Sequence, residues 1–184
     1  MKKITILLLL ISLAGCSEKS NLQEEFICAT KKFSNTEEVS DFKNKFSITY
    51  PKKWKTQLYF DSIQTQIIAA DTTRNFTDTY TINIEYNSGD LELNEKFRTG
   101  ILAELSEAEQ QVLKSKTTTF KGKPCFWTIS KGKKATYDYF YFELFMKQNK
   151  LNYFKITSEV YGNTNIDTRF CESIAIIETL KFLD

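Results

Sequence analysis

The sequence predicts an α+β fold in which an antiparallel β-sheet is flanked by helices. From residue 46 onward, apolar and polar residues alternate over several short segments, as they do in strands that bury one face. Short polar turns separate the later segments, which is typical of an antiparallel meander. Two further segments carry apolar residues at helical spacing, and these helices are expected to cover the sheet.

The strands expected from this alternation occupy most of the chain. The clearest is at residues 80–86, and residues 46–50 alternate in the same way before Pro51, which has no N–H to donate to a ladder. Further extended segments are expected at residues 58–70, 112–120, 124–130, 135–146 and 151–161. Polar turns are expected at residues 121–123, 131–133 and 148–150, and three consecutive strands joined by such short turns would make a meander.

The first helix is expected at residues 94–107. Its apolar stripe consists of Leu93, Phe97, Ile101 and Leu105. Gly100 weakens this helix by about 1 kcal/mol relative to alanine, so packing must hold it in place. The second helix is expected to begin near Asp167, a suitable N-cap, and to continue to about residue 181.

The N-terminus has the three zones of a secretion signal. Lys2 and Lys3 supply positive charge, residues 4–13 form an apolar run, and small residues follow up to Cys16. The run is shorter than the roughly 20 residues that a membrane-spanning helix needs. The residues Leu13-Ala14-Gly15-Cys16 resemble the lipobox of bacterial lipoproteins. This resemblance implies removal of residues 1–15 and attachment of a diacylglycerol, with acyl chains such as palmitate, to Cys16.

Three segments follow from this interpretation. Residues 1–15 are expected to be a signal peptide, residues 16–25 the lipidated cysteine and a flexible tether, and residues 26–184 a single globular domain. The lipid on Cys16 would hold the domain at a membrane of the cell envelope. Ser17 is not the aspartate that retains lipoproteins on the inner membrane in some bacteria, which favours the outer membrane over the inner one.

The charge balance gives no support to a nucleic-acid partner. The chain has 25 basic and 23 acidic residues, and loss of residues 1–15 removes Lys2 and Lys3. The mature side chains are then neutral overall, so no basic field would attract nucleic acid.

The remaining cysteines allow at most one disulfide within the chain. Of the four, Cys16 is assigned to lipid, which leaves Cys28, Cys125 and Cys171 in an oxidising compartment. A bridge between Cys28 and Cys171 would tie the N-terminal segment to the last helix, and such a long loop would stabilise the fold by roughly 4 to 5 kcal/mol. The alternative is three buried thiols.

The composition excludes most familiar catalytic sites. The chain has no histidine, which removes Ser-His-Asp and Cys-His systems and histidine metal sites. The cysteines form no Cys-x-x-Cys pair, and the glycines form no phosphate-binding loop. We therefore expect no catalytic residue, metal or cofactor. An acid/base pair drawn from Glu85, Glu104 and Glu107 is the enzymatic alternative.

Two Ser-x-x-Lys matches also occur, at residues 40–43 and 130–133. This type of catalysis needs the serine and lysine one helical turn apart, with the lysine desolvated. Neither match lies in a predicted helix, so neither is expected to be an active site.

The aromatic run at residues 137–142 is the best candidate for a binding face. In a strand, Tyr137, Tyr139 and Tyr141 point to one side, while Phe140 and Phe142 point to the core. The tyrosine side is either a surface on which a helix packs, which is favoured, or an exposed platform for a sugar ring or a protein partner.

One local motif resembles a known family. In residues 46–54, an alternating strand ends at Tyr50-Pro51 and is followed by Trp54. This pattern is similar to the first strand of PsbP-like proteins, a superfamily that includes Mog-type Ran-binding and DcrB-like envelope proteins. The resemblance implies a PsbP/Mog-like α/β/α sandwich over about residues 45–182, with Tyr50 and Trp54 packed across the Pro51 corner. It carries over no functional residue.

These observations favour a membrane-anchored bacterial lipoprotein that acts as a non-enzymatic accessory or protein-binding module at the cell envelope. The expected partners are the membrane, through the Cys16 lipid, and an envelope protein. The alternatives are a small-ligand binder, for example of carbohydrate, that uses the tyrosine face, and a carboxylate-based envelope enzyme.

Overall fold

The computed structural model describes residues 21–29, 31–134 and 136–183. The predicted signal peptide and Cys16 lie outside these ranges. No helix within the described ranges combines the length and the apolar character needed to cross a membrane. The elements follow one another as α1 (Asn21–Glu25), β1 (Thr36–Ser40), β2 (Phe46–Pro51), β3 (Lys55–Phe60), β4 (Gln64–Ala70), η1 (Phe76–Asp78), β5 (Tyr80–Ser88), α2 (Glu95–Glu107), β6 (Gln111–Phe120), β7 (Lys123–Lys134), β8 (Tyr137–Lys147), β9 (Asn152–Tyr161), α3 (Ile166–Ile177) and β10 (Lys181–Phe182).

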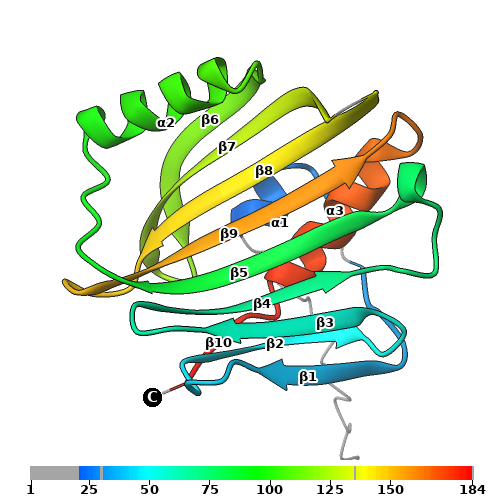
Figure 1. The fold of residues 1–184 in the computed structure, drawn as a ribbon, viewed down its shortest axis with the longest axis horizontal. Helices are drawn as coiled ribbons and strands as arrows, with labels where there is room; N and C mark the ends of the chain where they lie inside the picture. The colour runs from blue at the N-terminus through cyan, green and yellow to red at the C-terminus, as the bar shows by residue number, and fades with distance from the viewer. Residues whose placement is uncertain (1–20, 30, 135, 184) are drawn as a thin grey trace, which may run out of the picture.

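A seven-stranded antiparallel sheet is the centre of the fold (Figure 1). Its strand order is β3-β4-β5-β9-β8-β7-β6, which confirms the predicted meander and extends it to the four strands β6, β7, β8 and β9. Strands β3, β4 and β5 also pair with one another in sequence order. They join the meander because β5 pairs with β9. A separate three-stranded sheet contains β1, β2 and β10.

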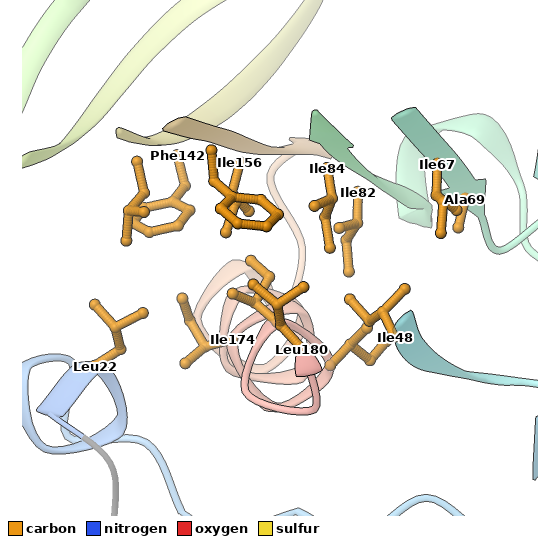
Figure 2. Packing of buried hydrophobic residues seen from close by; sticks show 14 of the residues in the cluster. Leu22, Ile48, Ile67, Ala69, Ile82, Ile84, Phe142, Ile156, Ile174 and Leu180 are labelled. Carbon is orange, nitrogen blue, oxygen red and sulfur yellow. The ribbon is translucent and has the colours of Figure 1, made fainter. Parts of the chain in front are cut away.

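The main core lies between one face of the large sheet and a layer made of α1, α3 and β2. Figure 2 shows Ile82 and Ile84 pointing from β5 toward Ile174 and Leu180. Ile48 of β2 closes the same core, and all five of these side chains are at most 2% exposed. On the opposite face, α2 covers a second apolar cluster, so helices flank the sheet on both sides as the sequence predicts.

The Tyr50-Pro51-Trp54 motif forms the corner that the family resemblance implies. The rings of Tyr50 and Trp54 stack with centroids 5.9 Å apart. The backbone N–H of Trp54 donates to the Pro51 carbonyl over 2.9 Å. Burial raises the pKa of the Tyr50 hydroxyl. Trp54 also contacts Tyr80 edge to face, which joins the corner to β5.

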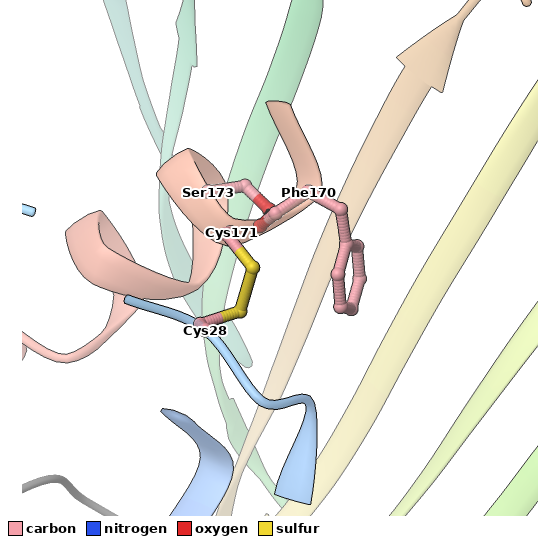
Figure 3. Close-up of a disulfide and its surroundings, with 4 residues drawn as sticks. All are labelled: Cys28, Phe170, Cys171 and Ser173. Carbon is pink, nitrogen blue, oxygen red and sulfur yellow. Dashed lines mark hydrogen bonds between the residues drawn. A yellow bond between two sulfur atoms is a disulfide. The ribbon is translucent and has the colours of Figure 1, made fainter. Parts of the chain in front are cut away.

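Cys28 and Cys171 form a disulfide, with Cα atoms 5.3 Å apart (Figure 3). Cys125 is a buried free thiol. This outcome decides between the two alternatives that the sequence leaves open. The bridge fastens the segment after α1 to α3, while the neighbouring Phe170 ring points toward the sheet.

The last residues of the expected tether, residues 21–25, are helical and pack on the domain. Residues Asn21–Glu25 form helix α1, and Leu22 is fully buried in the main core. The Phe26 ring extends this contact by packing edge to face on Trp127. The sequence did not predict that this segment packs on the core, because the segment is mostly polar and only one leucine and one phenylalanine supply most of its apolar contact.

Three further boundaries differ from the sequence predictions. Residues 131–133 are not a turn, because β7 continues to Lys134 and Gly132 pairs with Tyr139 of β8. Residues 36–40 form strand β1 through pairing with β2, although their own sequence is mostly polar. Helix α3 begins at Ile166, with Asn165 rather than Asp167 at the N-cap position.

Candidate functional site

Helix α2 forms one wall of the candidate site. Asn94 caps the helix by accepting a hydrogen bond from the Phe97 N–H over 2.9 Å. The Phe97 ring then packs edge to face on Phe145 of β8, with centroids 5.1 Å apart. Ile101 and Leu105 continue the same apolar stripe and are buried against the sheet. The stripe therefore lays α2 across the sheet, as its spacing predicts.

Strand β8 forms the floor of the site by presenting different side chains to the two faces. Phe142, Leu144 and Met146 are buried in the main core. Tyr139 and Tyr141 point to the opposite face, toward α2. This division confirms the predicted separation of the phenylalanine and tyrosine sides.

A pocket of about 260 Å³ lies between α2 and this face of the sheet. We call it the acidic pocket. It is lined by Ile101, Glu104, Leu105, Gln110, Tyr139, Tyr141, Glu143 and Glu159. Three carboxylates and two tyrosine rings thus meet in one small volume.

The three candidate tyrosines have different environments. Tyr139 is 8% exposed and Tyr141 is half-buried, and both line the acidic pocket. Tyr137 is 43% exposed and packs instead on Phe76, with ring centroids 5.1 Å apart. The structure therefore brings two of the three together beneath a helix, and the three do not form a flat exposed platform.

Gly132 makes room for Tyr139. A Cβ atom at Gly132 would lie 3.1 Å from Cε1 of Tyr139 and 3.1 Å from Cγ of Gln110. Both of these neighbours line the pocket, so the glycine allows the tyrosine ring to lie directly on β7.

Glu143 is the most buried carboxylate of the pocket. Its side chain is 7% exposed and lies 3.0 Å from Nζ of Lys155. The Tyr141 hydroxyl donates to the same carboxylate over 3.2 Å. Burial raises the pKa of Tyr141, and the charge of Glu143 raises it further. For Lys155, burial acts to lower the pKa, but the nearby Glu143 outweighs it and raises the pKa.

Glu159 lies on the neighbouring strand, opposite Tyr141. Nζ of Lys134 is 3.2 Å from its carboxylate, and the Tyr161 hydroxyl donates to it. Burial, followed by this hydrogen bond, raises the pKa of Tyr161 to about 12. Glu104 on α2 is exposed and adds a third negative charge. The pocket lining is therefore acidic even after two lysine partners are counted.

The sequence identified only part of this site. Of the candidate carboxylates Glu85, Glu104 and Glu107, only Glu104 lines the pocket. Glu143 and Glu159 were missed because their meeting depends on strand register. The available signal was that both are charged residues inside largely buried strands.

A second hollow, of about 460 Å³, lies beside the Tyr50-Pro51-Trp54 corner. At its base, the Glu172 carboxylate accepts hydrogen bonds from Lys31, from Arg74 over 3.1 Å and from Tyr80 over 3.0 Å. Burial acts to raise the pKa of Glu172, but these partners outweigh it and lower the pKa. The Glu172 charge is thus paired within the fold, and the network fastens Lys31 to α3 beside the disulfide.

The Ser-x-x-Lys matches do not form a site. Ser130 and Lys133 both lie on β7, where Ser130 is buried and donates to Gln110 over 2.5 Å. Ser40 ends β1, and Lys43 follows in the turn. Within residues 21–29, 31–134 and 136–183, no group of three or more histidine, cysteine or acidic residues could hold a metal ion.

No protein-family model and no curated protein sequence matches the chain. Solved structures do match the chain. Cyanobacterial PsbP (CyanoP) from Synechocystis sp. PCC 6803 superposes with a TM-score of 0.53 and 10% identity, over 84% of this chain and 96% of that one. The fold is PsbP-like. A protein of unknown function from Pseudomonas aeruginosa, PA94, gives a TM-score of 0.50 at 10% identity, over 79% of this chain and 96% of that chain.

A PsbP-like arrangement also occurs within a longer protein. A crystal structure from Bacteroides thetaiotaomicron VPI-5482 superposes with a TM-score of 0.51 and 13% identity. The match covers 82% of this chain but only 50% of the other one. At these identities the similarity establishes the PsbP-like fold, and function must be argued from the site itself.

Proposed function

We propose that this chain is a membrane-anchored, non-enzymatic accessory protein of the bacterial cell envelope. Its PsbP-like domain binds another protein by accepting a basic side chain in the acidic pocket. The observation that carries this proposal is the convergence of Glu104, Glu143 and Glu159 around Tyr139 and Tyr141. Carboxylates and tyrosine faces both attract a lysine or arginine head group.

The size of the pocket favours a side chain over a free small molecule. Small-molecule sites usually enclose about 300 to 1,000 Å³. The acidic pocket encloses about 260 Å³, and α2 closes it from one side. A single long side chain from a partner suits this space, with the rest of the partner lying on α2 and the neighbouring strands.

The electrostatics of the pocket favour binding over acid–base catalysis. A general acid must be held protonated, which requires a carboxylate without a cationic partner. Glu143 is paired with Lys155, and Glu159 is paired with Lys134. Both carboxylates therefore already have a cationic partner, and the pocket lining still holds one more carboxylate than it has lysine partners.

The envelope location rests on the N-terminal sequence. The lipobox-like residues that end at Cys16 support cleavage and lipidation there, and Ser17 supports the outer membrane over the inner one. The polar residues after Cys16 would hold the domain close to the lipid surface, which suits a partner that lies in or on the same membrane.

Photo-cross-linking in living cells tests the proposed pocket. A photoreactive phenylalanine analogue at position 100 of the full-length chain has room, because nothing lies within 4 Å of a Cβ built at Gly100. We expect a cross-link to one envelope protein. The substitution Glu104→Lys should reduce its yield at least fivefold.

The matched control is Glu107→Lys, on the same exposed helix but outside the pocket. It should leave the cross-link yield unchanged. No specific cross-link, or one equally sensitive to both substitutions, would contradict the proposed site. Loss of the cross-link on addition of a free sugar instead would favour the carbohydrate-binding alternative, which the two tyrosine rings also support.

A further inference from the structure

The two edges of the seven-stranded sheet are protected to very different degrees. Strand β6, at one edge, carries a bulge between Val112 and Lys114 and exposed lysines, and Lys114 lies 2.7 Å from Glu25 of α1. Bulges, lysines and covering segments are the devices that prevent an edge from pairing with another chain. Strand β3, at the other edge, has regular pairing with β4 and no proline.

Strand β3 also exposes a cluster of apolar side chains. We call this cluster the β3 patch. It consists of Leu58 and Phe60 on one face of β3 together with Phe42, which are 37%, 53% and 57% exposed. Tyr59, 48% exposed, points to the opposite face of the strand, and Ile63, 61% exposed, lies in the turn between β3 and β4. The Phe42 ring reaches Phe60 from the β1–β2 turn, with centroids 4.9 Å apart. An apolar patch that borders a free strand edge is typical of a surface that another chain covers.

The hydrogen-bond pattern of the hairpin shows which backbone groups of β3 face outward. The Asp61 N–H donates to the Gln64 carbonyl over 3.0 Å, so Asp61 belongs to a hydrogen-bonded pair with β4. Such pairs alternate along an antiparallel ladder. Tyr59 and Gln57 therefore also bond to β4, while the N–H and C=O groups of Thr56, Leu58 and Phe60 point to the free edge.

This outward set is self-complementary. A two-fold axis at Leu58 places Leu58 opposite Leu58 of a second copy, and Thr56 opposite its Phe60. Every outward residue then meets another outward residue, as a hydrogen-bonded antiparallel pair requires. The same register places Lys55 opposite Asp61 of the second copy, twice by symmetry. No like charges face each other within this register.

We propose that β3 pairs with β3 of a second copy of this chain, antiparallel and centred on Leu58. The pairing joins two seven-stranded sheets into one continuous sheet and covers the β3 patch on both copies. It leaves the acidic pocket open, because the pocket lies at β8, β9 and α2. The inference is therefore independent of the proposed partner protein.

Cysteine trapping tests the register directly. In a hydrogen-bonded antiparallel pair the Cα atoms are about 5.5 Å apart, within the range of about 4.4 to 6.8 Å that a disulfide spans. Leu58→Cys in the full-length chain, expressed in cells and analysed without reduction, should give a covalent dimer. The parent chain, run alongside, reports any bridge made by the native cysteines.

The matched control is Thr56→Cys, two residues away on the same face of β3. In the proposed register the two Thr56 positions are separated by four residues, or about 13 Å, which a disulfide cannot span. Thr56→Cys should therefore stay monomeric on the gel. Co-expressed with Phe60→Cys, it should form the mixed dimer. Equal trapping at positions 56 and 58, or none at position 58, would overturn the proposed register.

A second measurement tests whether the pairing exists without a covalent trap. Light scattering on the purified full-length chain should give the mass of a dimer, and Leu58→Lys should reduce it to that of a monomer, because two ammonium groups would meet on the two-fold axis. Glu107→Lys, away from β3, should remain dimeric. A monomeric parent chain, or Leu58→Cys trapped on a different protein, would overturn pairing between copies.

Discussion

Nζ of Lys155 lies 3.0 Å from the carboxylate of Glu143, a side chain that is 7% exposed. The two residues come from neighbouring strands of the PsbP-like sheet, and Glu143 lines the acidic pocket. A buried carboxylate is tolerated only with such compensation, because its loss of hydration is otherwise uncompensated. The pair therefore links the stability of the sheet to the charge of the proposed binding site.

Removing the lysine from this pair should destabilise the protein. We expect Lys155→Met to lower the free energy of unfolding by about 2 kcal/mol, because Glu143 is left buried without its cation. The double variant Glu143→Gln/Lys155→Met should recover part of the loss. Urea unfolding of the parent chain, both single variants and the double variant gives the coupling free energy. Strictly additive losses would contradict a direct interaction.

The Glu172 network should make stability depend on pH in the acid range. Its pKa is lowered in the folded protein, where Lys31, Tyr80 and Arg74 outweigh burial. The Glu172 carboxylate therefore binds a proton more readily in the unfolded chain than in the folded protein. Its contribution to stability is complete above about pH 5. It is lost as the pH falls through about 4.3, the pKa of a glutamate in the unfolded chain, and below.

Glu172→Gln should therefore reduce the decrease in unfolding free energy between pH 6 and pH 3. Urea unfolding at a series of pH values measures this slope. Glu107→Gln, on the exposed side of α2, is the matched control and should keep the parent slope. An unchanged slope in Glu172→Gln would show that its carboxylate does not contribute.

The disulfide joins Cys28 to Cys171, which are 143 positions apart in the sequence, and so closes a long loop. On the chain-entropy model, its removal should lower the free energy of unfolding by about 5 kcal/mol. Cys28→Ser, Cys171→Ser and the double variant should lose the same amount, because either change removes the bridge. Denaturant unfolding checks this, and a double variant much less stable than both single variants would contradict it.

Two glycines of the pocket region should respond to alanine in opposite ways. Gly132→Ala should destabilise the fold by about 1 to 2 kcal/mol, since its Cβ would press on Tyr139 and Gln110 at 3.1 Å. Gly100→Ala should stabilise it by up to about 1 kcal/mol, because the site is open and lies within α2. Thermal unfolding of both variants measures the difference, and a neutral Gly132→Ala would show that Tyr139 can shift freely.

Local patterns in the sequence predicted most elements of the fold. Apolar spacing predicted α2 to within one residue at each end, and alternation predicted β5 and the meander of β6 to β9. The continuation of β7 through Gly132 was missed, because its partner Tyr139 compensates for a glycine that otherwise signals a turn. Helix α1 was missed because Leu22 gains its stability from contacts with distant residues.

The sequence by itself determined the alternating strands, the amphipathic helices and the lack of histidine chemistry, because each follows from residue types or from spacing along the chain. Only the tertiary structure decided that Cys28 bonds to Cys171, that Glu143 and Glu159 meet beside Tyr141, and that β3 is a free edge. These features depend on which strands pair and in which register. Such pairing joins residues far apart in the chain, and it is selected by burial of the whole core rather than by any local pattern.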